Sequence, residues 1–528
     1  MVEHLKIRLK PEEFTDTEIV KVLLQELVKT RFPVGEQELR DFRLRRRSID
    51  ARQKQIWIEA EYIVATGADT TPHTGYPVVT FRQLPPDAPT VVIVGAGPAG
   101  LFAALRAIES GWRPIVIERG KPVEERLHDV VRLQKEGELN PESNFCFGEG
   151  GAGTFSDGKL YTRSKKRGNV DEVLALLHQH GAREEIMYEA HPHIGSDRLP
   201  KIIIQIRKTI LENGGEILFS TRMQRLIVEE GHVKGVVTSD GRTFRGPVIL
   251  ATGHSAHDVY RYLDSEGVRL EKKGFAMGVR LEHPQNLIDS IIYHRPKGRG
   301  EFLPPAEYKM VCQIEDRGVY SFCMCPGGVI VPSASADGEN VVNGMSASGR
   351  SGRWANSGMV VEIRPEDFPE YDSLGNLGML ELQENMERRF FKESASLKAP
   401  AQRMMDFVEG KPSITLPPTS FVPGIYPADF HKLFPASIAN RLKEGFKVFG
   451  RRFKGFLTND AILIGLESRT SSPIRIPRDP ETLNHPELPG LYPAGEGAGF
   501  AGGIVSSAID GRRVMDAIAS NFINDLTK

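Results

Sequence analysis

The chain has 528 residues, 40% of them hydrophobic, which suffices for roughly three domains of about 150 residues each. Its formal net charge is -1, with both signs spread along the sequence, and this excludes strong electrostatic attraction of the whole protein to nucleic acid or to membranes. Four irregularly spaced cysteines exclude a disulfide framework, and the charged N-terminal stretch differs from a signal peptide, so we expect a cytoplasmic protein.

Residues 1–80 are predicted to form a small α+β domain. The stretches "HLKIRL" and "IWIEAEYIV" alternate in polarity like half-buried strands. Residues 15–30 between them carry Val20, Leu23, Leu24 and Leu27 on one face of a helix. The segments "GADTTPHTGYP" and "RQLPPDAP" then have the Pro, Gly and Thr content of a linker.

A basic stretch, "RLRRRSIDARQK", occupies residues 43–54 of this first domain and contains five arginines and one lysine. The composition leaves two alternatives open, a docking site for RNA or another large partner, or the solvated face of a strand. The stretch has no interleaved aromatic residues on which bases could stack. Nucleic acid is therefore the less favoured partner.

The strongest motif begins at Thr90 in "TVVIVGAGPAGLFAALRAIESGWRPIVIERG", where a β-branched strand leads into a Gly-x-Gly-x-x-Gly turn and a helix. The first glycine permits the tight turn, the second lets a pyrophosphate approach the backbone, and the third lets the helix pack on the strand. Glu118 ends the next strand, where a carboxylate accepts hydrogen bonds from ribose hydroxyls. An adjacent arginine can favour a 2′-phosphate, but Glu118 at the strand tip indicates an adenosine ribose without one. The predicted dinucleotide site comprises Gly95, Ala96, Gly97, Pro98, Ala99, Gly100, Glu118 and Arg119.

Three other segments favour a flavin dinucleotide. "GPVILATGHSA" reads as a buried strand that ends in a turn, "LPGLYPAGEGAGFAGGIV" places two glycines at the start of a helix, and "FGEGGAGTFSDGKLYTR" is a glycine-rich loop. A helix start offers free amides and a positive dipole end to a flavin ring, and the loop lets backbone approach a ligand, although a surface loop is the alternative. The predicted contacts are Ala251, Thr252, Gly253, Gly495, Glu496, Gly502, Gly503, Ile504, and, for cofactor or substrate, Thr154, Ser156 and Lys159.

On these motifs the sequence resembles the FAD-dependent oxidoreductases of the glutathione-reductase-like superfamily. Through "RRSIDAR", "NFCFGEGGAGTFSDGKL", "CMCPGG", "NGMSASGR" and "RTSSPIRI" it is similar, more narrowly, to an uncharacterised bacterial FAD-dependent dehydrogenase family with a short N-terminal domain. The resemblance implies FAD as the cofactor and no established substrate. One departure is Gly495-Glu496, since many superfamily members have Gly-Asp there.

We therefore expect an α/β protein in which a Rossmann-like FAD-binding domain carries an inserted α+β substrate cap and a small N-terminal α+β domain. The FAD-binding domain is predicted over residues 88–260 and 465–528, and the cap over residues 261–464. An insertion between two segments of a cofactor domain usually covers the active site, which then lies at the domain interface.

Candidate substrate-binding groups lie near the ends of the predicted cap. Arg469 follows the returning strand in a polar turn and is the first candidate for binding a carboxylate or enolate, with a structural interface role as the alternative. Arg280, Glu282 and His283 are predicted to follow a strand, and His283 is either a base or a satisfied structural residue. Arg350 and Arg353 are candidates too, against a solvent-facing alternative.

Cys323 and Cys325 lie in "SFCMCPGGVIVPS", and residues two apart share one face of a regular strand. We expect the Pro-Gly-Gly sequence to end that strand near the interface. Three alternatives remain for these cysteines: buried packing, which we favour, then a substrate-side role for one or both thiols, and last a metal site. Packing comes first because the sequence shows no local cation or helix start that would activate a thiol.

The expected function is that of a FAD-dependent oxidoreductase for a small or medium organic substrate, and the alternative is a flavoprotein that docks to RNA or a macromolecule through residues 43–54. No second glycine fingerprint follows a strand between residues 160 and 480. A nicotinamide cofactor would therefore dock transiently as electron donor, or the substrate itself reduces the flavin. The apolar run at residues 91–108 contains three glycines and a proline, so we expect strand, turn and helix rather than a membrane span.

Overall fold

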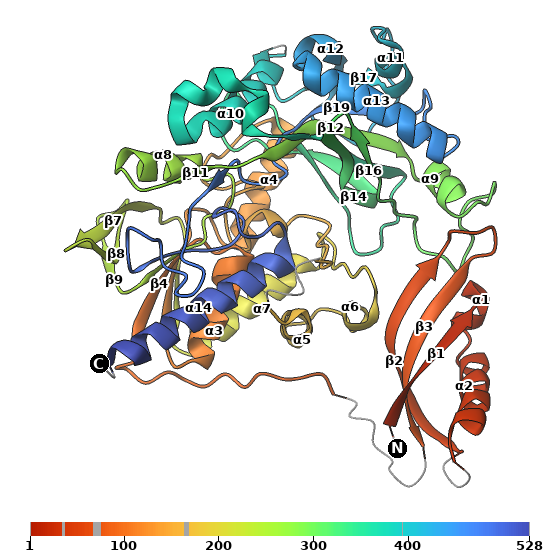
Figure 1. Ribbon diagram of the computed structural model, residues 1–528, viewed down its shortest axis with the longest axis horizontal. Helices are drawn as coiled ribbons and strands as arrows, with labels where there is room; N and C mark the ends of the chain where they lie inside the picture. The colour runs from red at the N-terminus through yellow and green to blue at the C-terminus, as the bar shows by residue number, and fades with distance from the viewer. Residues whose placement is uncertain (1, 34–36, 67–74, 163–167, 393, 527–528) are drawn as a thin grey trace.

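Three main β-sheets organise the chain in a computed structural model, which describes residues 2–33, 37–66, 75–162, 168–392 and 394–526 (Figure 1). One sheet belongs to a small N-terminal domain, one is the parallel sheet of a Rossmann-like domain, and the third lies in a cap above the parallel sheet. Residues 67–74 of the predicted linker lie outside the described residues.

The N-terminal domain is an antiparallel sheet covered by a helix. Its strands run in the order β1-β3-β2. The helix α2 packs on one face because Val20, Leu24 and Val28 recur at helical spacing and are buried against the sheet. The elements are β1 (Val2–Leu9), α1 (Pro11–Phe14), α2 (Thr17–Arg31), β2 (Leu39–Asp50) and β3 (Trp57–Thr66).

Strand β2 carries most of the basic stretch and joins the N-terminal domain to the rest of the protein. Arg47 forms an ion pair with Glu189, and its carbonyl accepts a hydrogen bond of 2.9 Å from the amide of Ala190. Arg45 pairs with Glu61 at 2.7 Å. Further members pair locally or stack, as Arg52 does with Asp50 and Arg43 over the ring of Tyr76. Arg45, Arg47 and Arg52 thus have carboxylate partners within the molecule.

The Rossmann-like domain is built on a parallel sheet in the order β21-β10-β4-β5-β6. These short strands are almost wholly apolar, as expected for strands covered on both faces. The strands are β4 (Thr90–Val94), β5 (Arg113–Ile117), β6 (Glu216–Leu218), β10 (Val248–Leu250) and β21 (Leu491–Pro493).

Helices from distant parts of the sequence cover one face of the parallel sheet, and a second apolar cluster forms on its other face. The first layer contains α3 (Pro98–Glu109), α5 (Val170–Gln179), α7 (Leu199–Glu212) and the C-terminal α14 (Ile504–Leu526). The second contains the small sheet β7 (Met223–Glu229), β8 (His232–Thr238) and β9 (Thr243–Arg245), with α8 (His257–Ser265). The remaining pieces are α4 (Val123–Glu136), η1 (Gly151–Gly153) and α6 (Glu185–Tyr188).

Glycines without side chains allow α3 to sit close to its neighbours. A Cβ on Gly100 would lie 1.9 Å from the carbonyl oxygen of Gly95, and a Cβ on Gly511 of α14 would lie 2.0 Å from the carbonyl oxygen of Ala99. The start of α3 is therefore held between the glycine turn and α14, with its free amides facing the end of β4.

The cap is an eight-stranded sheet with the central order β13-β14-β16-β12-β19-β17-β18, and β15 pairs with β14. Its strands are β12 (Phe275–Pro284), β13 (Val311–Ile314), β14 (Arg317–Pro332), β15 (Val342–Met345), β16 (Trp354–Ile363), β17 (Ala399–Arg403), β18 (Ile425–Pro427) and β19 (Ile462–Glu467). A two-stranded ribbon of β11 (Glu271–Lys272) and β20 (Ile474–Arg475) lies at the junction with the Rossmann-like domain.

Helices cover the outer face of the cap sheet, while the opposite face is turned toward the Rossmann-like domain (Figure 1). Phenylalanines on these helices, including Phe390, Phe430 and Phe449, are fully buried and form the cap core. The helices are α9 (Gln285–Ile292), α10 (Gly378–Lys392), α11 (Met404–Glu409), α12 (Phe430–Leu433) and α13 (Ala436–Arg452), with the 3-10 turns η3 (Pro365–Asp367) and η4 (Pro369–Leu377).

Several expected boundaries fall inside elements. The predicted break at residues 260/261 lies within α8, and the one at 464/465 lies within β19, which continues to pair with β12 as far as Glu467. The apolar run at residues 91–108 forms β4, the glycine turn and α3. Within the described part of the chain, none of the helices has the length and apolarity that a bilayer span needs.

Replacing Gly511 by alanine tests the close contact between α14 and α3. In an open helix position this change stabilises by up to about 1 kcal/mol, whereas here the new Cβ meets a backbone carbonyl and we expect a loss of about 1–3 kcal/mol. Chemical denaturation measures the free energy of unfolding. As a control, Gly349→Ala should change the free energy of unfolding by less than about 0.5 kcal/mol, because the new Cβ would lie 4.0 Å from Oγ of Ser351. A Gly511→Ala protein as stable as wild type would contradict the close contact.

Candidate functional site

A cavity of about 330 Å³ lies between the carboxyl ends of the parallel strands and the cap sheet. Ligands of open α/β sheets bind at this edge because the helix starts and loop ends converge there. Most of the residues predicted to bind the cofactor line it, namely Gly95, Gly97, Pro98, Ala99, Glu118, Arg119, Ser156, Lys159, Ala251, Thr252, Gly253, Gly495, Glu496, Gly502, Gly503 and Ile504. The cap contributes Phe322, Cys323, Cys325, Asn343 and Gly344.

Glu118 is fixed at one end of the cavity. The side chain is 5% exposed and accepts backbone hydrogen bonds from Ala96 at 2.8 Å, Gly120 at 2.9 Å and Gly148 at 3.0 Å. A carboxylate has about four acceptor sites, so roughly one remains for a ribose hydroxyl. Glu118 therefore both shapes the site and offers an acceptor to a nucleoside.

The glycine turn leaves room for a phosphate. Gly95 has φ +105°, and a Cβ there would lie 2.4 Å from the carbonyl oxygen of Ala251, so only glycine fits the turn. A Cβ on Gly97 would meet only the Cα of Gly151, at 3.9 Å. Gly97 thus faces open space at the start of α3, as a pyrophosphate-binding position requires.

The start of α14 opens onto the same cavity through Gly502, Gly503 and Ile504. No heavy atom lies within 4 Å of a Cβ built on Gly502 or Gly503. The first amides of a helix lack intrahelical acceptors and carry a partial positive charge, so this end of the cavity suits the electron-rich edge of a flavin ring. These residues fit FAD.

Three predicted cofactor residues support the site from behind rather than lining it. The amide of Ala96 donates to Glu118, and its carbonyl accepts from Gly150 at 2.8 Å. Gly100 packs on the glycine turn. Thr154 is buried, donates to the carbonyl of Glu149 at 2.7 Å and accepts from Arg126 at 3.1 Å.

Arg119 and Glu496 differ in how free their charges are. Arg119 pairs with Glu142 at 2.7 Å and Asp258 at 2.9 Å and lies over the ring of Phe147, so its charge is already compensated. Burial raises the pKa of Glu496 to about 7, opposed by Lys273. A carboxyl group that is partly protonated near neutral pH can donate as well as accept a hydrogen bond.

The two cap cysteines lie on β14, and the expected end of that strand at Pro326-Gly327-Gly328 is wrong. The strand runs through this sequence to Pro332, and its pairing with β16 shifts register between Phe322 and Cys325 and again before Gly328. Cys323 has a left-handed φ of +44° at this bulge. The regular alternation therefore fails, although both cysteines line the cavity.

Two cations lie near the sulfur of Cys325, although no basic residue is close to this cysteine in the sequence. The Sγ atom is 3.5 Å from Nη2 of Arg280 and 3.8 Å from Nζ of Lys159. The same Arg280 donates to the carbonyl of Cys323 at 2.7 Å and so holds the bulge in place. Cys323 is open to the cavity, yet the surrounding protein desolvates its thiolate and raises the pKa to about 11.

Arg469 lies in the cavity wall with its guanidinium bound on several sides. It donates to Glu339 at 2.7 Å and to Glu387 at 2.9 and 3.1 Å, both on the cap. It also contacts Ser255 at 3.4 Å and the sulfur of Cys146 at 3.7 Å in the Rossmann-like domain. Burial acts to lower the pKa of Arg469, but the charges of Glu387 and Glu339 outweigh it and raise the pKa. This placement favours the structural alternative, an interface arginine.

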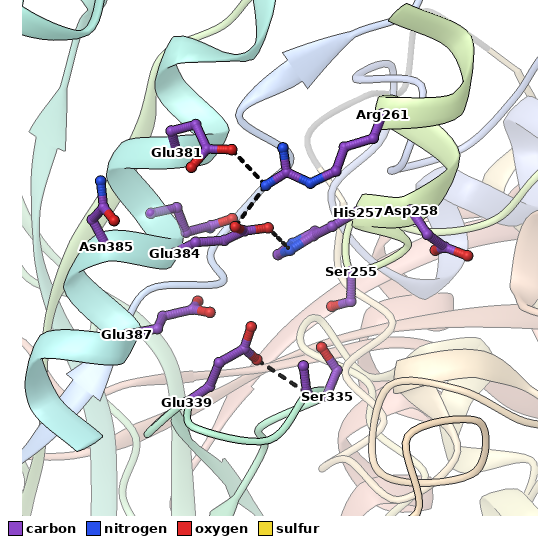
Figure 2. A network of polar contacts seen from close by, with 12 residues as sticks. Ser255, His257, Asp258, Arg261, Ser335, Glu339, Glu381, Glu384, Asn385 and Glu387 are labelled. Atoms are coloured by element: carbon purple, nitrogen blue, oxygen red, sulfur yellow. Dashed lines mark hydrogen bonds and ion pairs between the residues drawn. The ribbon is translucent and has the colours of Figure 1, made fainter. Parts of the chain in front are cut away.

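A second set of ion pairs joins α8 to α10 (Figure 2), and α10 also carries Glu387, the partner of Arg469. Glu384 of α10 binds His257 at 2.9 Å and Arg261 at 2.7 Å, and Arg261 also reaches Glu381. Figure 2 shows Glu387 and Glu339 below this set, facing Ser255 and Ser335. The cap is thus attached to the Rossmann-like domain by buried and half-buried charge pairs.

The residues predicted to follow a cap strand lie within it instead. Arg280, Glu282 and His283 are all part of β12 and fully buried. Arg280 pairs with Glu467, Glu282 accepts from Ser420, and His283 binds the carbonyl of Phe456 at 2.8 Å. His283 is not among the cavity-lining residues, so it has no access to a ligand there.

The two arginines of the "SASGRSGRWANSG" segment separate. Arg350 is 8% exposed and forms a two-pronged pair with Asp157, at 2.6 and 3.1 Å. Arg353 is exposed and stacks over Trp354. Arg353 therefore faces solvent, as the alternative interpretation held. Arg350 does not, because its ion pair with Asp157 joins the cap to the glycine-rich loop.

Sequence reasoning missed part of the cavity wall. Thr221, Arg222 and Met223 line the cavity just after β6. Ligands of such sheets bind at the carboxyl ends of the parallel strands, so these residues could have been predicted if β6 had been recognised in the sequence. Phe322, Asn343 and Gly344 come from cap strands whose pairing no local motif reveals. Within the described residues, no group of three His, Cys, Asp or Glu side chains is placed to bind a metal.

Replacing Gly97 by valine tests whether FAD binds along this cavity. The new side chain has room within the protein, so we expect folding to persist, but it would occupy the space of the pyrophosphate. The purified variant should be nearly colourless, with FAD content reduced by about tenfold or more, measured on the supernatant after heat denaturation. Gly349→Ala should stay fully yellow, and a Gly97→Val protein with full flavin occupancy would contradict the placement.

Comparisons with known proteins agree with this geometry. A family described as "FAD-dependent protein, C-terminal domain-like" matches residues 274–470, a FAD binding domain matches residues 90–128, and a domain of unknown function matches residues 1–65. The first match falls on the cap and the second on β4, the glycine turn and α3. FAD is therefore the cofactor of this protein. No family description names the glutathione-reductase-like superfamily, and that wider resemblance stays a prediction.

Relatives are similar over most or part of the chain. A thiamine thiazole synthase of Aeropyrum pernix is 28% identical over 28% of this chain and 43% of its own length. A solved geranylgeranyl bacteriochlorophyll reductase-like protein of Thermoplasma acidophilum has 13% identity, covers 83% of this chain and 80% of its own, and gives a TM-score of 0.36. An uncharacterised protein of Clostridium beijerinckii is 42% identical over 83% of this chain and 81% of its own length. The chain belongs to the same family as this protein, a family of FAD-dependent flavoproteins.

Proposed function

We propose that the protein is a FAD-dependent oxidoreductase whose small or medium organic substrate binds between the Rossmann-like domain and the cap. The observation that carries the proposal is a cavity lined at one end by the dinucleotide-binding turn and at the other end by β14 and β15 of the cap. A cofactor that places its adenosine at Glu118 and its pyrophosphate at Gly97 would extend its ring toward the cap.

The two ends of the cavity differ in chemistry. Backbone amides and glycines dominate the cofactor end, which suits phosphates. Side chains dominate the cap end, where Phe322 and Tyr161 offer apolar surface and Lys159 and Asn343 offer polar groups. Bound FAD would supply the redox chemistry, and the chain would bind the substrate, exclude water and compensate charge.

Docking to RNA through residues 43–54 gains no support. Several of the arginines there are paired or stacked within the molecule, and none of the matched descriptions refers to nucleic acid. The small-molecule reaction is therefore the function we retain.

Anaerobic mixing of the holoprotein with organic metabolites, NADH and NADPH tests this function. We expect at least one organic compound to bleach the visible flavin absorption. NADH and NADPH should act slowly, because no second glycine fingerprint follows a strand between residues 160 and 480 of the sequence. Asn343→Leu, a change at the cap end, should lower the rate at which that compound bleaches the flavin by about tenfold. The reason is that the side chain would lose a hydrogen bond from its amide group to the substrate.

Dithionite provides the control, since it should reduce the wild type and Asn343→Leu proteins equally. Rapid, stoichiometric reduction by NADPH with no response to any organic compound would contradict an organic reductant at the cap. Equal rates in wild type and Asn343→Leu would place the substrate elsewhere.

A further inference from the structure

Lys159 lies at the cap end of the cavity rather than with the phosphate-binding backbone. It belongs to the glycine-rich loop and lines the cavity, and its Nζ atom is 3.8 Å from the sulfur of Cys325 on β14. The pyrophosphate position at Gly97 belongs to the opposite wall, at the start of α3. Lys159 is thus placed where a substrate, and not the dinucleotide phosphates, would meet it.

The ammonium group of Lys159 has few strong partners. Among the residues that the structure describes, its contacts are Cys325 at 3.8 Å and Asp157 at 3.5 Å, both longer than a good charge-assisted hydrogen bond. Asp157 is already bound by Arg350 through two hydrogen bonds and by Ser346. With three donors available and a side chain that is 31% exposed, Lys159 can bind another acceptor.

The charged side chains nearest Lys159 balance one another, and one further cation, Lys309, lies farther out. Arg350 and Lys159 face Asp157 and Glu307, which balance them, and Lys309 lies over the ring of Tyr161 at the edge of the cavity. Arg280 is compensated by Glu467 behind Cys325. Burial acts to lower the pKa of Lys159, but Cys325 and Asp157 outweigh it and raise the pKa, so the amine stays charged.

The walls beside Lys159 are mainly apolar. Phe322 and Tyr161 line this end of the cavity, and the amide oxygen of Asn343 is taken by the backbone of Gly344 at 2.7 Å. An apolar body would pack against the rings while a negatively charged group meets the ammonium. Arg469, the first candidate for this task, is occupied by Glu339 and Glu387.

We propose that Lys159 binds the carboxylate of the substrate, which is an organic acid with an apolar body. This inference rests on the proposed function, because it places the acid at the cap end of the cavity, where that function places the substrate. It concerns binding only, so it is tested without turnover.

The test is a titration of the holoprotein with acetate, phenylacetate and benzoate, and with their uncharged amides, followed by the perturbation of the visible flavin spectrum. At least one carboxylate should produce a saturable change, and its amide should bind about tenfold more weakly or not at all. Lys159→Gln should weaken the carboxylate by about tenfold or more, and Lys159→Arg should restore it to within roughly threefold of wild type.

Lys309→Gln is the matched control, since it removes one positive charge outside the cavity wall and should change the affinity by less than about threefold. Equal binding of acid and amide, no response to any of the acids, or unchanged affinity in Lys159→Gln would each overturn the proposal. So would loss of FAD from Lys159→Gln, which would make Lys159 a cofactor ligand. Failure of every organic reductant would refute the oxidoreductase function but leave this binding result intact.

Discussion

The buried charge of Arg469 fixes the relation between the cap and the Rossmann-like domain. A guanidinium cannot be removed from water without partners, and truncating one side of a buried pair costs about 3–5 kcal/mol. Arg469 is 6% exposed, and its partners come from both domains: Glu339, Glu387 and Ser335 on the cap, and Ser255 and Cys146 on the other side. The two walls of the cavity therefore meet in one defined arrangement.

The two walls of the cavity differ in whether backbone or side-chain groups face the ligand. The Rossmann-like wall presents glycines, helix starts and one fixed carboxylate, which suit a constant ligand such as FAD. The cap wall presents aromatic, sulfur and charged side chains, which can be varied without disturbing the dinucleotide. The bulge at Cys323 turns this part of β14 toward the cavity, and Arg280 stabilises it from within the sheet.

Local sequence predicted the parts of the fold that depend on local physics. The strand, glycine turn and helix at residues 90–109 could be recognised because the glycine spacing follows a β-branched strand and precedes a helix, and because Gly100 must pack closely on Gly95. The helix α2 could be recognised from its apolar spacing. The roles of Arg469 and Arg280 could not be recognised, because their partners lie 82 to 323 and 43 to 187 residues away in the sequence, respectively. The bulge in β14 likewise depends on pairing with β16, which carries no motif.

A crystal structure of the FAD-bound protein tests the central claim most directly, namely that one cavity brings the flavin ring to the cap. We predict the adenosine at Glu118, the pyrophosphate against Gly97 and the isoalloxazine ring between the start of α14 and β14, with Lys159 and Cys325 beside it. A ring directed away from the cap, or an adenosine beside Cys325, would contradict the account.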